Sequence, residues 1–382
     1  MRRISRATLW AVVVFAVPLA AQESKNTAPW KDSFYPLFIS QANEFPIVVV
    51  HFEERKQADY FARSPFAGRF QVDIGGGTKG SHFALVGFDA PLLWKDWRFA
   101  ARAGAAKAAR FGYFGLGNNT KFIEDSVDDD TSPFFYRMKR NRYFGSAEIS
   151  RHIHGPFYIA AAADVEHSIL TDLPENSLFR QDFGTGDVTD TDVRGRLTLV
   201  LDTRDNEFDT KKGVFAEASA QEGSGGDGYT RFTGAVRGYV PIREGTTLAA
   251  RVAGTGITGD PPLNALFEIP TWGVNVIQAV GGVNSNRGYD FQRLTGEDAL
   301  IFNAEIRHDL LNLGDFGAFT LVGFFDAGRV FQGEPFKLTT EDMKVGAGGG
   351  LAVRVLRFTI WTFNFAGGSD GFKFTAGTGW AF

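Results

Sequence analysis

Apolar and polar residues alternate with a period of two along most of the chain, and the longer period of amphipathic helices is almost absent. In segment 194–206, Leu197 and Leu199 lie on one face, whereas Arg196 and Thr198 lie on the other. The same alternation recurs in segments 228–241, 299–310 and 372–382. Such a pattern predicts β-strands, each with one apolar face and one polar face.

About sixteen strands can be placed along the chain, and sixteen is among the even numbers typical of bacterial single-chain barrels. Their predicted ranges are 46–53, 57–64, 67–76, 82–92, 97–112, 136–152, 156–170, 194–206, 213–224, 228–241, 246–258, 299–310, 316–330, 343–354, 357–366 and 372–382. Strands of about ten residues cross a bilayer when they are tilted. The predicted fold class is all-β, a transmembrane antiparallel β-barrel of about 16 strands.

A soluble β-sandwich would show the same alternation, with its apolar faces buried in the core. Two features favour a membrane barrel instead. Several polar faces carry arginine at successive positions on one side, as Arg194 and Arg196 do, and short turns alternate with long polar loops. The short turns lie around 94–97, 153–156, 205–213 and 241–245, and the long loops around 113–135, 171–193 and 259–298. In outer-membrane barrels, short turns face the periplasm and long loops face the exterior.

The N-terminal end is typical of an export signal, with Arg2, Arg3 and Arg6 before an apolar run and small residues at 20–21. The apolar run is about a dozen residues long, which is too short for a membrane anchor. We therefore expect an exported protein of the cell outer membrane. The predicted domains are a signal peptide at 1–21, a periplasmic tether or plug at 22–45, and the barrel at 46–382.

Composition and local motifs narrow the classes of function. The chain has no Cys, which excludes disulfides, thiolate metal sites and cysteine nucleophiles. The formal net charge of −4 gives no basic field for nucleic acid, so no nucleic-acid partner is expected. No nucleophile elbow occurs, and we expect no catalytic residues, no cofactor and no metal. For the histidines 152 and 154 and the acidic run 128–130, a surface pair and a solvated loop are favoured over metal sites.

Motifs in the second half of the chain occur in the order found in a known barrel family. Asp-Thr-Arg-Asp-Asn stands at 202–206, Arg-Gly-Tyr at 287–289 and Phe-Phe-Asp at 324–326, and the last residue is Phe382. They resemble the strand–turn–strand signature, lumen-loop signature, Phe-x-Asp strand and insertion signal of the BamA/TamA outer-membrane assembly-factor superfamily, the bacterial surface antigen barrel. The turn-signature residues are Asp202, Arg204, Asp205, Asn206 and Gly213, and the insertion-signal residues are Trp380 and Phe382.

The resemblance implies a role in inserting or translocating proteins or lipids at the outer membrane. Only about 24 residues separate the signal from the first predicted strand, too few for the family's POTRA domains, so a barrel-only member is expected. Thr210 stands where the family usually has Pro, and Asn286 where it usually has Val. The implied partners are outer-membrane lipid and lipopolysaccharide, with periplasmic chaperones and barrel-assembly machinery during the protein's own insertion. We expect a monomer that is not an enzyme.

A passive, anion-preferring pore or surface protein is the alternative function. Inward arginines outnumber the inward acids that the strand pattern places, so a water-filled lumen would favour anions. Internal ion pairs that cancel the charge would remove this preference, and the sequence leaves the two possibilities open.

The long loop 259–298 is expected to fold into the lumen. Gly281 and Gly288 allow tight turns, and Glu305 and Asp326 point inward from nearby predicted strands. The guanidinium of Arg287 can form two hydrogen bonds with a carboxylate, whereas an ordinary surface loop would leave it in solvent. The predicted latch comprises Arg287, Gly288, Tyr289, Glu305 and Asp326.

The last predicted strand carries two further expectations. Trp380 and Phe382 share a face with Phe374, which places them on the lipid-facing side at an interfacial aromatic belt. Gly377 and Gly379 weaken this strand, and Pro46 lies near the start of the first predicted strand. A weak seam between these two strands would favour the assembly role.

Overall fold

The computed structural model describes residues 28–123, 134–173, 177–357 and 359–382. The predicted signal peptide and the acidic run 128–130 lie outside these ranges. The strands are β1 (Trp30–Gln41), β2 (Glu44–Gln57), β3 (Phe66–Gly77), β4 (His82–Trp94), β5 (Trp97–Gly112), β6 (Arg137–His154), β7 (Phe157–Thr171), β8 (Asp187–Asp202), β9 (Gly213–Gly223), β10 (Gly228–Arg243), β11 (Thr246–Asp260), β12 (Glu268–Thr271), β13 (Asn275–Gln278), β14 (Asp298–Asn312), β15 (Gly317–Phe331), β16 (Lys344–Val355), β17 (Thr359–Gly368) and β18 (Gly371–Thr378). The helices are α1 (Leu178–Phe183) and the 3-10 turns η2 (Leu263–Phe267) and η3 (Gly314–Phe316).

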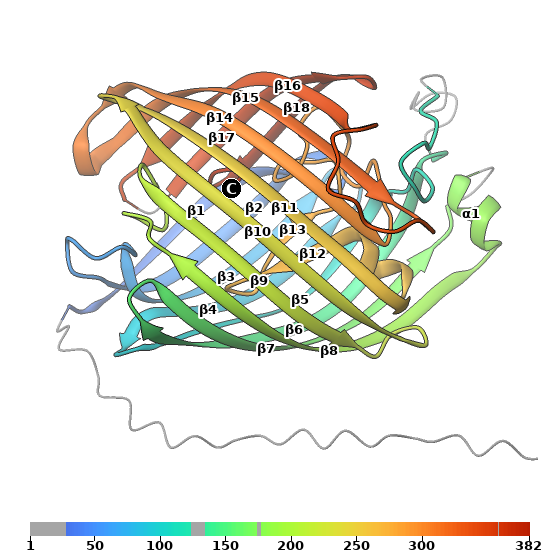
Figure 1. Ribbon diagram of the computed structural model, residues 1–382, viewed down its shortest axis with the longest axis horizontal. Helices are drawn as coiled ribbons and strands as arrows, with labels where there is room; N and C mark the ends of the chain where they lie inside the picture. Colours follow the sequence, from blue (N-terminus) through green and yellow to red (C-terminus); the bar gives the residue numbers. More distant parts are fainter. Residues whose placement is uncertain (1–27, 124–133, 174–176, 358) are drawn as a thin grey trace, which may run out of the picture.

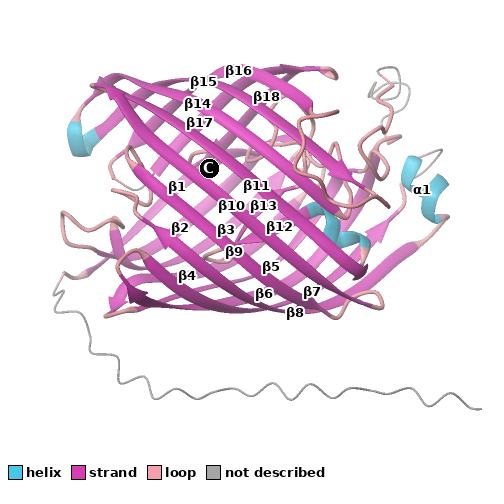
Figure 2. Cartoon of the chain, in the orientation of Figure 1, coloured by secondary structure: helices cyan, strands magenta, loops and turns pink. Residues whose placement is uncertain are grey.

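Sixteen of the strands form one antiparallel sheet that curls into a barrel (Figure 1). Each strand pairs with the next along the chain, except that β11 pairs with β14 because the loop between them leaves the wall. Strands dominate the picture, and the few helical turns lie in connections (Figure 2). Across the described ranges, no helix is long and apolar enough to span a membrane. The predicted all-β barrel is confirmed.

The alternation of the sequence maps onto the two faces of the barrel wall. On β8, Leu197 and Leu199 point outward and are 62% and 64% exposed, whereas Arg196 and Thr198 point inward and are buried. A soluble sandwich would bury the leucines, so the arrangement is that of a barrel whose outer face meets lipid. The same orientation holds on β10, where Phe232 is exposed and Arg231 and Thr233 point inward and are buried.

The number of wall strands agrees with the sequence, but the set of strands differs at the N-terminal side. Residues 30–41 form β1, which pairs with β2, so the prediction of a tether or plug over 22–45 is wrong for this part. Lys31, Asp32 and Pro36 interrupt the alternation of apolar and polar residues in this segment. Conversely, the predicted strand 57–64 is a turn, closed by a hydrogen bond from the Ala58 amide to the Pro65 carbonyl. One missed strand and one false strand therefore offset each other.

The connection between β11 and β14 folds into the barrel interior. Its strands β12 and β13 form a separate two-stranded sheet, which lies behind the wall strands in the view of Figure 1. Ile269, Ile277 and Val280 of this loop pack against the small inward residues Ala235 and Ala253 of the wall. Small side chains on the wall leave room for the loop, and burial of its apolar residues holds it there.

Candidate functional site

Arg287, in the C-terminal third of the lumen loop, is held by two carboxylates of the barrel wall. Its Nε and Nη2 donate to the two oxygens of Asp326 on β15, both at 2.8 Å, and its Nη1 donates to Glu305 on β14 at 2.5 Å. The Arg287 guanidinium also lies 3.6 Å from the centroid of the Phe324 ring. All three charged side chains are at most 2% exposed. The contact predicted for Arg287 is present, and the solvated surface loop is excluded.

The backbone around Arg287 approaches the wall too closely for ordinary side chains. A Cβ on Gly288 would lie 2.8 Å from the Cα of Gly346 on β16 and 2.8 Å from the carbonyl oxygen of Gly367 on β17. The next residue, Tyr289, is buried and its hydroxyl lies 3.3 Å from the Val345 carbonyl oxygen. Glycine on both sides of the contact therefore lets the loop dock along these strands.

A second anchor of the loop involves Glu268 at the start of β12. Its carboxylate accepts hydrogen bonds from Arg140 at 3.2 Å and from Arg142 at 2.8 Å, both on β6. Further along, the Trp272 amide donates to Glu217 on β9 at 2.7 Å. The hairpin of the loop is thus anchored to β6 and β9, which are separated in the sheet by β7 and β8.

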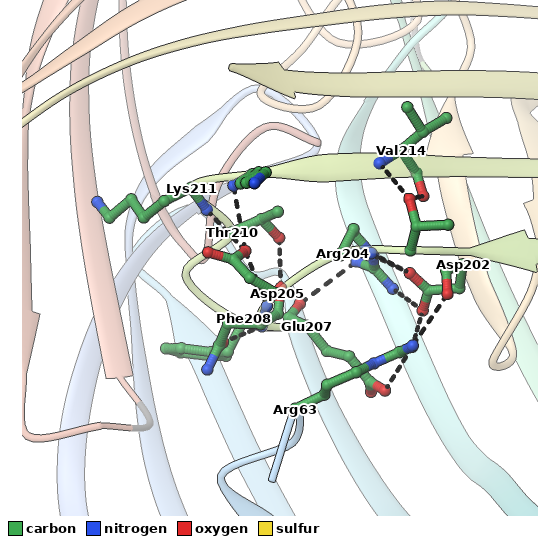
Figure 3. A network of polar contacts seen from close by, with 12 residues as sticks. Arg63, Asp202, Arg204, Asp205, Glu207, Phe208, Thr210, Lys211 and Val214 are labelled. Carbon is green, nitrogen blue, oxygen red and sulfur yellow. Dashed lines mark hydrogen bonds and ion pairs between the residues drawn. The ribbon is translucent and has the colours of Figure 1, made fainter. Parts of the chain in front are cut away.

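The turn between β8 and β9 carries the predicted turn signature, and its side chains form a network of polar contacts (Figure 3). Asp202 accepts hydrogen bonds from the Arg204 side chain at 2.9 and 3.0 Å, and its Oδ2 lies 2.5 Å from Nη2 of Arg63 in the β2–β3 turn. Arg204 in turn lies over the ring of Phe215 on β9, 4.6 Å from its centroid. The signature aspartate therefore ties two turns together.

Other signature residues shape the turn itself. Asp205 Oδ1 accepts from the amides of Asn206, Lys211 and Lys212 at 2.9 to 3.2 Å, which closes the turn around a single carboxylate. Gly213 has a φ of 115°, and a Cβ there would clash with the Thr203 carbonyl oxygen. Both residues therefore have a structural reason to be present.

Thr210, at the position where the BamA/TamA-type family usually has Pro, stabilises the turn by a side-chain hydrogen bond. The Thr210 hydroxyl donates to the Asn206 carbonyl oxygen at 2.6 Å, and the side chain is buried. The hydrogen bond fixes the end of the turn that a proline ring would otherwise stiffen.

Glu207 is a charged residue of this turn that the sequence did not single out. Both of its oxygens accept from the Arg98 guanidinium on β5, at 2.8 and 2.6 Å. Burial alone would raise the pKa of Glu207, but the charge and hydrogen bonds of Arg98 outweigh it and lower the pKa to about 2. Glu207 is therefore an anion at neutral pH and clamps the turn onto the wall.

The Glu207 clamp predicts a pH dependence of stability. Its folded pKa is about 2 against an ordinary 4.5, so its contribution is complete above about pH 4.5 and is lost as pH falls toward 2. Glu207→Gln should lower the unfolding temperature at pH 7, and the gap to the native protein should narrow between pH 4.5 and 2. Thermal melts in detergent at several pH values measure this. The exposed Glu222→Gln is the control, and a gap that stays constant to pH 2 would contradict the clamp.

The C-terminal residues depart from their predicted positions. β18 ends at Thr378, and Gly379 adopts a φ of 82°, which turns the chain inward. The Phe382 side chain is only 8% exposed, and the Arg307 guanidinium lies 4.0 Å from the Trp380 ring centroid. Their predicted lipid-facing positions are therefore wrong, and cation–π contacts with lumen arginines explain the inward turn. A role of Trp380 and Phe382 in insertion stays a prediction.

The first and last wall strands meet without a regular ladder. β1 and β18 are the two ends of the sheet order, and no backbone pairing joins them within the described residues. The contacts that cross this seam are few. The Ser40 hydroxyl accepts from the Ala376 amide at 3.1 Å, the Tyr35 hydroxyl lies 3.3 Å from the Thr359 hydroxyl, and the Phe45 and Phe374 rings lie 5.3 Å apart. The first and last strands thus lack a ladder where the sequence predicts a weak seam, with β1 in place of 46–53.

A further contact crosses the seam at the end of the barrel that carries the short turns. Arg357, beyond β16, donates to the Tyr60 carbonyl oxygen of the β2–β3 turn at 2.8 Å. Its guanidinium also lies 4.6 Å from the centroid of the Tyr60 ring. This contact, the Arg357–Tyr60 clasp, joins the β16–β17 turn to the β2–β3 turn. It therefore crosses the seam without involving a residue of β1 or β18.

The predicted histidine pair at 152 and 154 lies at the end of β6, beside a short turn. Among the described residues, no group of three or more His, Asp or Glu side chains is arranged to hold a metal ion. His152 instead contacts the Gly155 carbonyl oxygen at 2.8 Å beside a short turn.

Comparison with known proteins agrees with the fold and the motifs. Residues 68–380 match the family model described as the Omp85 superfamily domain. No curated protein matches the sequence. The fold is similar to BamA from Haemophilus ducreyi lacking POTRA domains 1-3, at 12% identity over 91% of this chain and 70% of that chain, with a TM-score of 0.57. It is also similar to CdiB from Escherichia coli, at 10% identity over 92% and 67% of the two chains, with a TM-score of 0.54.

These identities are low, so the likeness to solved structures supports the architecture alone. The family match extends over most of the wall strands and includes the lumen loop and the turn signature. Together with the outward apolar face, it confirms the resemblance inferred from the motifs. The chain is an outer-membrane β-barrel that belongs to the Omp85 superfamily.

Proposed function

We propose that this barrel assists the insertion or translocation of proteins or lipids at the outer membrane by opening between β1 and β18. The observation that carries the proposal is the seam between these strands, which lacks the ladder that joins every other neighbouring pair of wall strands. Opening it would expose strand edges that can pair with another chain. Proteins and lipids of the membrane are therefore the substrate class.

The energy of opening is expected to be small at this position. Elsewhere in the wall, neighbouring strands share ladders such as the fifteen register pairs between β7 and β8. Across the seam, the described residues provide the scattered contacts of Ser40, Tyr35 and Phe45 and the Arg357–Tyr60 clasp, without a ladder. Each hydrogen bond contributes about 0.5–1.5 kcal/mol net, so the barrel should open here before it opens elsewhere.

The latched loop argues against the passive pore as the main function. The loop packs on the inner wall and is fixed by Arg287 and Glu268, which leaves the lumen occupied. A pore that conducts freely needs a continuous water path. The excess of arginine over acid around the remaining cavity is the one observation that favours the pore, and it is explained more directly by an anion site.

The seam can be tested by reversible cross-linking, because the chain contains no Cys. Ser40→Cys/Ala376→Cys should form a disulfide across the seam in the reconstituted barrel. We expect the native protein to accelerate insertion of a test outer-membrane barrel into phospholipid vesicles, and the oxidised double variant to lose this acceleration. Reduction should restore it.

The control pair is Thr233→Cys/Thr255→Cys, which joins two facing residues of the regular β10–β11 ladder. Its oxidation should leave the acceleration intact. Full activity of the oxidised seam variant, or no acceleration by any form, would contradict the proposed function.

A further inference from the structure

Two arginines stand directly opposite each other on adjacent wall strands. Arg237 of β10 and Arg251 of β11 are register partners, and both line the same cavity in the lumen. Like charges at directly opposed positions of an antiparallel pair destabilise the sheet. Such a pair therefore calls for a compensating negative charge.

The protein supplies little of that charge. The nearest acid to Arg237 is Glu217, at 3.7 Å, beyond hydrogen-bond distance, and the buried Arg237 Nε has no partner among the described residues. Arg251 is 2% exposed, and the partners recorded for it are neutral: the Asn303 side chain and the carbonyl oxygens of Asn284 and Ala381. Arg251 thus faces the space with neutral partners alone, and Arg237 has Glu217 as a more distant ion-pair partner.

The space itself is large enough for a ligand. The cavity has a volume of about 510 Å³, within the range of small-molecule sites. Seven arginines and four acids are among the described residues that line it. Phe215 and Trp272 form part of its wall, with their rings 5.7 Å apart. Six of the seven arginines have a carboxylate within 4 Å, whereas no ion pair is recorded for Arg251 among the described residues. The uncompensated charge of Arg251, beside the loosely paired Arg237, favours an anion.

Arginine pairs bind oxyanions of phosphate geometry through parallel N–H···O bonds. We propose that the lumen cavity between Arg237 and Arg251 is a binding site for a phosphate-type oxyanion, supplied either as a free phosphate or as a lipid headgroup. Bound there, the anion neutralises the opposed arginines and joins β10 to β11 beneath the lumen loop. The site goes beyond the seam function and does not depend on it.

Binding can be measured by equilibrium dialysis with labelled inorganic phosphate, in uncharged detergent and at constant chloride and ionic strength. We expect saturable binding of phosphate that chloride does not displace. Arg237→Gln should weaken it by about tenfold or more, because a charged hydrogen-bond donor is lost. Arg237→Lys keeps the charge but not the fork and should weaken it less.

The matched control is Arg243→Gln, an exposed arginine of the same strand outside the cavity, which should bind like the native protein. A short-chain phosphatidic acid tested in parallel distinguishes the sources. Saturable binding of the phosphatidic acid alone, lost in Arg237→Gln, would identify a lipid headgroup as the ligand. Binding of neither probe above the chloride baseline, or equal binding by Arg237→Gln and Arg243→Gln, would overturn the site.

Discussion

Arg287→Ala should lower the free energy of unfolding by about 3–5 kcal/mol, because it leaves the buried carboxylate of Asp326 without a cation and removes one of the two cations at Glu305. Asp326 and Glu305 are at most 1% exposed and share this single guanidinium from the loop, although Arg307 also contacts Glu305. The loop should then leave the wall, and single-channel conductance should rise. Denaturant unfolding in detergent and planar-bilayer recordings measure the two effects.

Two further variants test whether the bidentate geometry of Arg287, rather than its positive charge alone, stabilises the loop. Arg287→Lys should recover little stability, since an ammonium group cannot bond Asp326 and Glu305 in the same geometry. Arg243→Ala removes an exposed arginine and should change stability by less than about 0.5 kcal/mol. Equal, small losses in Arg287→Ala and Arg243→Ala would contradict a structural role for the latch.

Glu268→Ala should release the hairpin of the lumen loop from β6. Arg140 and Arg142 would then depend on the carboxylate of Glu166, which also pairs with Arg194. We expect a loss of about 2–3 kcal/mol, below the range for a fully buried pair because Glu268 keeps some contact with water. Limited proteolysis should cut the loop faster, and unfolding curves should shift to lower denaturant.

Glu297 offers a matched control within the same loop. Its carboxylate accepts a hydrogen bond from the neutral Gln332 side chain at 2.9 Å, so Glu297→Ala leaves no cation unpaired. Its effect should be less than half that of Glu268→Ala. If the two variants lose stability and protease resistance equally, the hairpin anchor is wrong.

The wall of the barrel could be predicted from the sequence because successive wall residues face lipid and lumen alternately. Leu197 faces lipid and Arg196 faces the lumen, and this alternation appears in the sequence as a period of two in hydrophobicity. β1 was not predicted as a strand because its charged N-terminal end and Pro36 interrupt the period of two at an edge of the sheet. Its position becomes evident only from its pairing with β2.

The latch could be predicted because its three charged members lie on inward faces and in a loop rich in Gly. Glu268 and Glu207 were missed for a different reason. Their partners, Arg142 and Arg98, lie more than a hundred residues away in the chain, and only the closed barrel brings them together. An acid isolated among apolar residues in a loop, as Glu268 is, was the only available signal.

The direction of the C-terminal residues could not be read from alternation. The period of two continues formally to Phe382, but a single glycine with a positive φ ends the strand before Trp380. Glycine permits that turn without requiring it. Contacts with a lumen arginine favour the inward direction, since Arg307 stacks on Trp380 and lies near Phe382.

A double-mutant cycle between Arg287 and Asp326 tests the central claim, that the loop is anchored to the wall through this pair. Unfolding free energies of Arg287→Ala, Asp326→Ala and the double variant are compared with that of the native barrel. The account predicts that the double variant loses less than the sum of the singles, with a coupling energy of about 1–3 kcal/mol. Losses that add to within about 0.5 kcal/mol would show that the two residues act independently, and would contradict the latch.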